Sequence, residues 1–321
     1  MSEGSAAALF IGSLVLSVLA SAVLAKRLDQ VGVYLGASAG LTGLITALAA
    51  DSPEIASAIS ALTSGRHDLG LGVIFGSNIF NLAALLGLGA LVAGPICCPR
   101  RTLILNAGAS VAVTAIVIAQ RLYGLPTVMT GALMAAVVLP YVTVSALKPS
   151  HLAPMRLPSA VANALRSAVI GTEVETTEGQ PPQPPSWADV TAIAPLLAAV
   201  VLASLGLVRA ASALGGQWGW SDLTLGALMI ASLTGLPNLI TAFRLATQGR
   251  GAAVVSETYN SNSLNLIFGA FLPTILLPLS VLSPMGHFAM WWMAGTTLLS
   301  GALYQVPEVV TRRGFRDAAR V

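Results

Sequence analysis

Two carboxylates and a proline interrupt a long apolar stretch in the first half of the chain, in the segment Asp51-Ser52-Pro53-Glu54. A charged group at membrane depth costs roughly 2.5–3.5 kcal/mol on insertion scales, and such groups persist mainly where they face a cavity or a pathway. The segment Gly235-Leu236-Pro237-Asn238 places a proline and an amide at the corresponding point of the second half. We therefore predict a polar site at the centre of the molecule, built from both halves.

The polar residues near both prolines recur at helical spacing, so that each group shares one helix face. Proline lacks an amide hydrogen and also frees a backbone carbonyl one turn earlier. Carboxylate, hydroxyl, amide and carbonyl oxygens suit hard cations such as Ca²⁺, Na⁺ or Mg²⁺ rather than copper or zinc. The groups that share a face are Ala47, Asp51 and Glu54; Ser77, Asn78 and Asn81; Thr234 and Asn238; and Glu257, Ser261 and Asn265.

The composition indicates a multi-pass membrane protein. The chain is 55% hydrophobic and 9% charged, whereas soluble domains carry about 25% charged residues. Its expected partners are therefore the lipid bilayer and small cations, and no basic patch indicates nucleic acid. The oligomeric state stays open, and a monomer is compatible with the sequence. Apolar stretches predict nine spans, at about 6–25, 31–63, 69–94, 102–120, 126–147, 187–209, 217–248, 252–281 and 286–304.

Lysine and arginine are distributed unequally between the two sides of this layout. Thirteen of the sixteen lie on the side opposite the N-terminus, and only Arg66, Arg121 and Arg209 lie on the N-terminal side. Because cytoplasmic loops carry an excess of these residues, we predict a cell-membrane protein with the N-terminus outside and the C-terminus in the cytoplasm. The segment 148–186 is expected to be a proline-rich linker with no core of its own, and the same layout places it in the cytoplasm.

The two halves repeat each other at an offset of 184 residues, which places Pro53 on Pro237 and Glu54 on Asn238. The same offset superposes Gly65-Arg66 on Gly249-Arg250, Ser77-Asn78 on Ser261-Asn262, and Asn81 on Asn265. Five spans precede the second copy, so the copies have opposite orientations. We predict an all-α fold of two inverted-topology repeats of about five transmembrane helices, with broken helices at the site, a common design of secondary transporters. The first repeat is 1–147 and the second is 187–321, where a tenth span is apparently missing.

At this point the sequence resembles a known family. Ala47-Leu48-Ala49-Ala50-Asp51-Ser52-Pro53-Glu54, followed by Gly76-Ser77-Asn78-Ile79-Phe80-Asn81, is similar to the alpha-repeat of the sodium/calcium exchangers and the wider cation/calcium exchanger superfamily. The resemblance covers both halves and the central loop, and is strongest over 44–89. It implies exchange of Ca²⁺ for Na⁺ or H⁺ by alternating access, without a cofactor. It also implies a ligand set of backbone around Ala47 and Ala50 with Glu54, Ser77, Asn81, Thr234, Asn238, Ser261 and Asn265.

Several positions depart from the family pattern. Asp51 stands where the family has a serine, while Asn238 replaces the acid of the second repeat and Asn265 stands where many exchangers have an aspartate. Glu257 lies one turn before Ser261, where it would restore a negative charge. Helix capping remains an alternative role for Asp51 and Glu54. For Asn78, Asn81, Asn262 and Asn265, hydrogen bonding between helices is the alternative.

Our first hypothesis is a secondary active antiporter that exchanges Ca²⁺ for Na⁺, with Asp51, Glu54 and Asn81 as the metal ligands and Asn78 and Asn262 beside them. A cation/proton antiporter is the nearest alternative, because an intramembrane carboxylate can carry a proton. A degenerate, non-transporting ion-binding membrane protein is the alternative from another class, favoured by the missing acid at 238. An enzyme is disfavoured, since no nucleophile–base pair or phosphate-binding loop is evident.

The topology gives the first testable prediction. A reporter fused to the C-terminus of the whole chain should read as cytoplasmic, because the arginine-rich tail then stays on the positive side of the membrane. Activity of a periplasmic or extracellular reporter at that position would contradict the nine-span layout.

Overall fold

The computed structural model describes residues 1–94, 96, 98–147, 185–279 and 281–303, and the part described is helical with no strand. The predicted linker, apart from its last two residues, and the arginine-rich tail lie outside it. The first half contains α1 (Glu3–Tyr34), α2 (Ala39–Ala50), α3 (Ser52–Thr63), α4 (His67–Phe80), the π-helix η1 (Asn81–Leu85), α5 (Leu86–Ala93), α6 (Arg100–Tyr123) and α7 (Thr127–Ala146). The second half contains α10 (Trp187–Thr191), α11 (Ile193–Trp218), α12 (Asp222–Thr224), the π-helix η2 (Leu225–Ile230), α13 (Ala231–Thr234), α14 (Leu236–Thr247), α15 (Gly251–Leu264), the π-helix η3 (Asn265–Phe271), the 3₁₀-helix η4 (Leu272–Ile275) and α16 (Pro284–Leu303).

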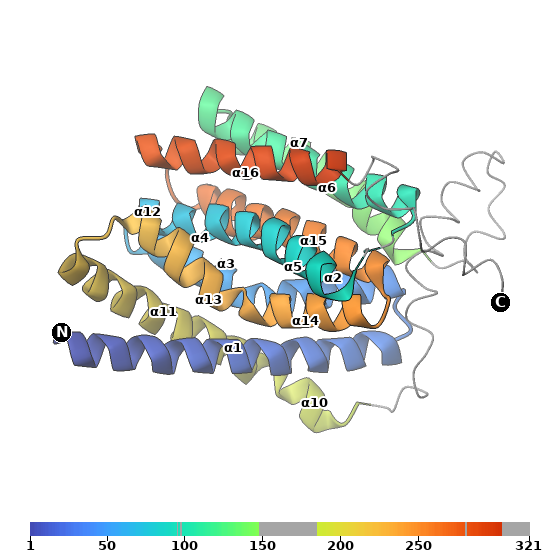
Figure 1. Cartoon of the computed structure of the whole chain (residues 1–321), viewed down its shortest axis with the longest axis horizontal. Helices are drawn as coiled ribbons and strands as arrows, with labels where there is room; N and C mark the ends of the chain where they lie inside the picture. The colour runs from blue at the N-terminus through green and yellow to red at the C-terminus, as the bar shows by residue number, and fades with distance from the viewer. Residues whose placement is uncertain (95, 97, 148–184, 280, 304–321) are drawn as a thin grey trace.

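The helices lie roughly along one common direction (Figure 1), and many are long and apolar. Within the described ranges, five could cross a membrane by length and composition, or six if the bent pair Asp222–Thr234 and Leu236–Thr247 counts as one span. Large apolar side chains also remain on the outside of the bundle, including Val128 at 84% exposure and Leu202 at 66%. An outer surface of this kind fits hydrocarbon rather than water.

The bundle has two ends, which we call the N-terminal face and the opposite face. At the N-terminal face, Trp218 Nε1 at the end of α11 donates to Glu3 Oε1 at the start of α1 over 3.0 Å. Arg66, before α4, binds Asp222 at the start of α12 at the same end, with Nε 2.7 Å from Oδ2. The opposite face holds the ion pair between Arg27 of α1 and Asp189 of α10. Figure 1 shows the N-terminus at one end of the helices and the α14–α15 connection at the other.

The backbone confirms the internal repeat that the sequence predicts. Helices α3 and α14 both contain twelve residues and begin at Ser52 and Leu236, and α4 and α15 are likewise separated by the same offset at both ends. The residue between the half-helices has φ −78° and ψ −6° in both copies, at Asp51 and at Gly235. The turns that follow use a left-handed glycine, with φ 76° at Gly65 and 74° at Gly249. The backbone conformations match although the side chains differ, so the two halves have the same local backbone structure.

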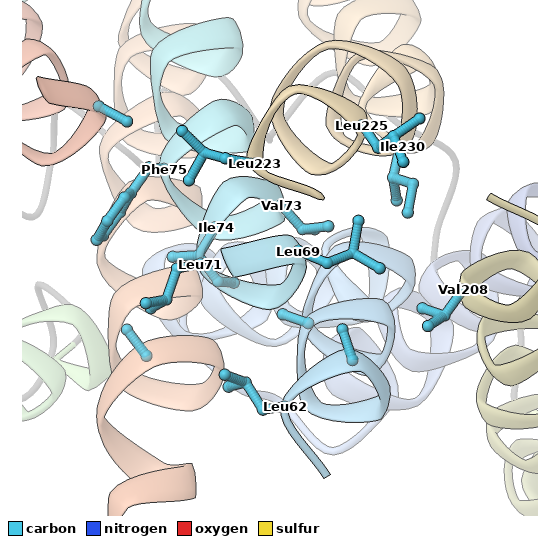
Figure 2. Close-up of a cluster of buried hydrophobic side chains, with 14 of the residues drawn as sticks. Leu62, Leu69, Leu71, Val73, Ile74, Phe75, Val208, Leu223, Leu225 and Ile230 are labelled. Carbon is cyan, nitrogen blue, oxygen red and sulfur yellow. The ribbon is translucent and has the colours of Figure 1, made fainter. Parts of the chain in front are cut away.

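The largest apolar core surrounds α4, whose Leu69, Leu71, Val73, Ile74 and Phe75 are fully buried. Figure 2 shows these side chains together with Leu223, Leu225 and Ile230 of the segment that runs from α12 to η2. The core is apolar all round α4, which is typical of a helix enclosed by other helices.

Glycines let α4 and the α12–η2 segment approach closely enough for backbone contact. A Cβ at Gly72 would lie 2.6 Å from the carbonyl oxygen of Leu223, and a Cβ at Gly76 would lie 2.4 Å from Ala227 Cα. On the partner segment, a Cβ at Gly226 would lie 2.4 Å from the carbonyl oxygen of Leu69. Small residues at such crossings allow helices to pack in lipid, where no hydrophobic force drives them together.

Gly226→Ala should therefore destabilise the protein. The new methyl group meets backbone atoms that cannot rotate away, and overpacking of this kind costs about 1–3 kcal/mol. Thermal unfolding of the purified protein in detergent measures the effect as a lower midpoint. Gly108→Ala is the matched control, since nothing lies within 4 Å of its Cβ position in α6. An equal or smaller loss for Gly226→Ala than for Gly108→Ala would contradict the close packing.

Candidate cation-binding site

The prolines break two helices at the centre of the bundle, as the sequence predicts. In the first repeat, α2 ends at Ala50 and α3 begins with Pro53 in its first turn. In the second, α13 ends at Thr234 and α14 begins with Pro237 in its first turn. Proline is favoured in the first turn of a helix, where its missing amide hydrogen has no intrahelical partner to lose. The breaks therefore begin new half-helices, and the polar residues follow them.

Two of the π-helices begin at asparagines that are equivalent in the two repeats. Asn81 starts η1 directly after α4, and Asn265 starts η3 directly after α15. Single π-turns are rare and are often associated with functional sites. Here each one follows a buried serine by four residues, Ser77 in α4 and Ser261 in α15, so that a buried hydroxyl and a buried amide lie one turn apart in each repeat.

Asp51 connects the two repeats through hydrogen bonds. Its Oδ1 accepts from Asn238 Nδ2 at 2.7 Å and from Ser261 Oγ at 2.6 Å, and both donors belong to the second repeat. Ser261 Oγ in turn accepts from Asn81 Nδ2 of the first repeat at 2.7 Å. Three side chains are thus joined, directly or through one another, to the Asp51 carboxylate, which lies between α2 and α3. They come from α14, α15 and the start of η1. Asn238 stands where the resembled family has the acid of its second repeat. Here its amide donates to Asp51, an acid of the first repeat.

Three of these side chains, and three further polar side chains of the two repeats, carry oxygen atoms that are enclosed and have no hydrogen-bond partner. The residues concerned are at most 1% exposed. A buried polar atom without a partner costs about 1–3 kcal/mol, so a group of them in one place calls for an explanation such as a bound ion. The atoms are Asp51 Oδ2, Glu54 Oε1 and Oε2, Ser77 Oγ, and the Oδ1 atoms of Asn81, Asn238 and Asn265.

This set of atoms fits a hard cation. It offers two carboxylates, one hydroxyl and three amide oxygens, and hard cations such as Ca²⁺ take six to eight oxygen ligands of these kinds. Within the described residues no three His, Cys, Asp or Glu side chains come together as a metal site, so the neutral oxygens would supply most of the shell. The hydroxyl and the amides add no charge, so the charge of the set is that of its two carboxylates.

Other predicted residues have bonding partners outside this centre. Asn78 Nδ2 donates to the carbonyl oxygen of Asn262 at 3.3 Å and lies 3.5 Å from Met293 Sδ. Asn262 Nδ2 donates to Ser110 Oγ of α6 at 2.5 Å. These two amides connect α4, α6, α15 and α16, although the Oδ1 atom of each is enclosed and unpartnered. Their geometry matches the alternative of hydrogen bonding between helices.

The remaining predicted residues lie at the edge of the centre. The Thr234 hydroxyl donates to the carbonyl oxygen of Ile230 at 2.8 Å, within its own helix turn. The carbonyl oxygen of Ala47 accepts the Asp51 amide at 2.8 Å, and Ala50 is the last residue of α2. Glu257 on α15 is partly exposed, unlike the enclosed carboxylates.

One residue that the sequence reasoning missed is Ser57. It is fully buried, and its hydroxyl oxygen has no hydrogen-bond partner. It follows Glu54 by three residues, so it lies on the same face of α3. The spacing from Glu54 could have identified Ser57 from the sequence. The repeat gives no further support, because the equivalent residue in the second repeat is Thr241 rather than a serine.

Inverted repeats, two proline-broken helices and a buried oxygen cluster where the breaks meet define a polytopic membrane transporter. The family model described as "Sodium/calcium exchanger protein" matches residues 5–147 and 190–313. The chain therefore belongs to the sodium/calcium exchanger protein family, and it is a membrane antiporter rather than an enzyme.

Individual relatives agree with this assignment. The chain is 26% identical over 239 residues to the "Putative antiporter CaxA" of Alkalimonas amylolytica, covering 74% of this chain and 70% of that protein. It superposes on the H⁺/Ca²⁺ exchanger CAX with a TM-score of 0.68 at 14% identity, covering 93% of this chain and 76% of the other. It superposes on the sodium–calcium exchanger NCX_Mj with a TM-score of 0.56 at 17% identity, covering 97% and 100%. Both structures share the fold of this chain.

A cation should stabilise the wild-type protein through this cluster. With Ca²⁺ at about 100 times its dissociation constant, linkage adds roughly 2.7 kcal/mol to the free energy of unfolding. Glu54→Gln should abolish the Ca²⁺-induced rise in the thermal midpoint, because it removes a charge from the shell. Asn78→Ala should lower the midpoint yet keep most of the rise, because its amide mainly joins helices. Glu3→Gln, at an exposed acid on the N-terminal face, should keep both values.

The comparison of these variants by differential scanning fluorimetry decides the role of each group. A Ca²⁺-induced rise that survives Glu54→Gln would exclude the cluster as the binding site. A rise lost in Asn78→Ala but retained in Glu54→Gln would reverse the two assigned roles.

Proposed function

We propose that this chain exchanges Ca²⁺ for Na⁺ at one site, by alternating access between its two repeats. The carrying observation is the enclosed set of unpartnered oxygens around Asp51 and Glu54, contributed by both repeats. An ion held there would bind atoms on α3, η1, α14 and η3 together, so its arrival and departure can bias how the repeats are packed. This links ion binding to the conformational change that transport requires.

The charge of the site limits the exchange. Asp51 and Glu54 are its two carboxylates, and the other members of the shell are neutral. One Ca²⁺ balances two carboxylates, and two monovalent cations would balance them equally. We therefore propose that one divalent cation moves against two monovalent cations, which leaves the site neutral in both loaded states and avoids burying net charge.

A proton is the second candidate for the counter-ion. The specific observation in its favour is the better superposition on the H⁺/Ca²⁺ exchanger CAX, with a TM-score of 0.68, than on the sodium–calcium exchanger NCX_Mj, with a TM-score of 0.56. The replacement of two acids by Asn238 and Asn265 also reduces the charge that would hold several Na⁺ ions at once.

For the orientation in the membrane, we propose that the opposite face is cytoplasmic, because most of the lysines and arginines are predicted on that side.

Uptake of radioactive Ca²⁺ into proteoliposomes tests this function. Vesicles loaded with Na⁺ and diluted into Na⁺-free medium should take up Ca²⁺ at least roughly tenfold faster than vesicles without the gradient. Glu54→Gln should reduce this uptake to the background rate, because the removal of one buried charged ligand costs several kcal/mol. Glu3→Gln, far from the site, is the matched control and should transport at the wild-type rate.

The two counter-ions give different outcomes in the same vesicles. Uptake that follows an imposed pH gradient and ignores Na⁺ would replace Na⁺ by H⁺ and leave the site assignment intact. No Ca²⁺ uptake under either gradient would overturn Ca²⁺ exchange.

A further inference from the structure

Glu257 is an acidic side chain that the central cluster does not use. It lies on α15, one turn before Ser261 and therefore nearer the opposite face, where α15 begins at Gly251. Among the described residues it makes no hydrogen bond, and its carboxylate is not one of the enclosed oxygens of the cluster. The side chain is partly exposed, whereas Asp51 and Glu54 are completely buried.

The charges around Glu257 place it between the cluster and the protein surface. It interacts electrostatically with Asp51 of the cluster and with Arg244 and Arg250 at the opposite face. The two arginines also interact with Asp29, which is exposed near the end of α1. Along α15, Glu257 thus lies between Arg250, which precedes the helix, and Ser261, which donates to Asp51.

The equivalent position in the first repeat is closed. The residue 184 positions before Glu257 is Val73 in α4, which is fully buried (Figure 2). A Cβ at Gly226 would lie 2.8 Å from the Val73 backbone nitrogen, so backbone fills the space beside it. The glycines of this contact, Gly72 and Gly76, correspond to Ser256 and Asn260 in α15. Larger side chains on α15 prevent the same backbone contact at the opposite face.

The ion pairs show the same asymmetry. At the N-terminal face, Arg66 binds Asp222 through two nitrogens and so connects the loop before α4 to α12. Its counterpart Arg250 has no ion pair within 4.0 Å in the described part of the chain, and its Nε is enclosed without an acceptor. Within the described residues, α4 therefore has a backbone contact and an ion pair at the N-terminal face that α15 lacks at the opposite face, the side on which Glu257 lies.

We propose that Glu257 is an entry subsite for the cation, which binds there on its way from the opposite face to the cluster. This inference rests on the proposed function and refines it. A carboxylate in a passage raises the local cation concentration, with effects of roughly 10- to 1,000-fold on capture. Arg244 and Arg250 weaken the attraction, which suits a subsite from which the ion must move on. This role lies outside the central shell, in which the sequence predicts Glu257 to restore a negative charge.

Accessibility of a cysteine to a membrane-impermeant thiol reagent tests the geometry without any transport. In a Cys97→Ser, Cys98→Ser background, Glu257→Cys should react when a methanethiosulfonate cation is added at the opposite face. It should not react from the N-terminal face. Val73→Cys is the matched control at the equivalent position and should be unreactive from both faces. An unreactive Glu257→Cys, or equal labelling of both positions, would overturn the inference.

Side-specific kinetics test the role in transport. In vesicles of uniform orientation, Glu257→Gln should raise the KM for Ca²⁺ added at the opposite face by roughly tenfold. The KM for Ca²⁺ added at the N-terminal face should change less than twofold, and Glu257→Asp should restore most of the affinity. Equal changes on both sides would place Glu257 in the central shell instead, and no change would remove it from the path.

The two proposals fail in distinguishable ways. A wild-type protein without Ca²⁺ flux would overturn the proposed function, and the entry subsite with it. Normal flux that is lost in Glu54→Gln, together with an unreactive Glu257→Cys, would leave the function standing and overturn only the entry subsite.

Discussion

The hydrogen bonds around Asp51 are the contact on which the rest of the structure depends. A carboxylate enclosed in a membrane protein must be neutralised or solvated by fixed dipoles, since bare burial is prohibitive. Asn238 and Ser261 supply those dipoles from the second repeat, and they reach Asp51 only because α14 restarts at Pro237 and α15 passes beside it. The broken helices, the repeat and the close packing of α4 all serve to bring these groups together.

The distribution of charge between the repeats has a physical consequence. Both carboxylates of the cluster belong to the first repeat, three residues apart at the start of α3, while the unpartnered oxygens that the second repeat adds to it, on Asn238 and Asn265, are neutral. An ion would therefore be attracted mainly by the first repeat and coordinated by oxygens of both repeats. In a transporter with an acid in each repeat, both halves would share the attraction. Here the amide of Asn238 is engaged as a donor, and its remaining oxygen can still face an ion.

Much of this arrangement could be predicted from the sequence, because it follows from local chemistry. Pro53 and Pro237 mark breaks through their missing amide hydrogens, and the offset between them fixes the pairing of Ser77 with Ser261 and Asn81 with Asn265. The fold class and the family follow from the same residues. The contacts between repeats could not be predicted, because residues 51 and 238 meet only through the tertiary packing. For that reason the sequence did not distinguish the amide of Asn238, which binds Asp51, from that of Asn78, which binds another helix.

The difference between the two faces arises from single residues that the repeat does not conserve between its copies. Gly72 and Gly76 allow backbone contact with Leu223 and Ala227, and Arg66 then adds an ion pair with Asp222 at the same end. The corresponding helix α15 has Ser256 and Asn260, and its arginine has no such partner in the described residues. Two inverted copies with identical sequences would close equally well at either face. Because these copies differ at the glycines and at the ion pair, packing of the described residues favours closure at the N-terminal face. In the alternating access proposed above, an ion or a counter-ion has to offset that difference when the other face closes.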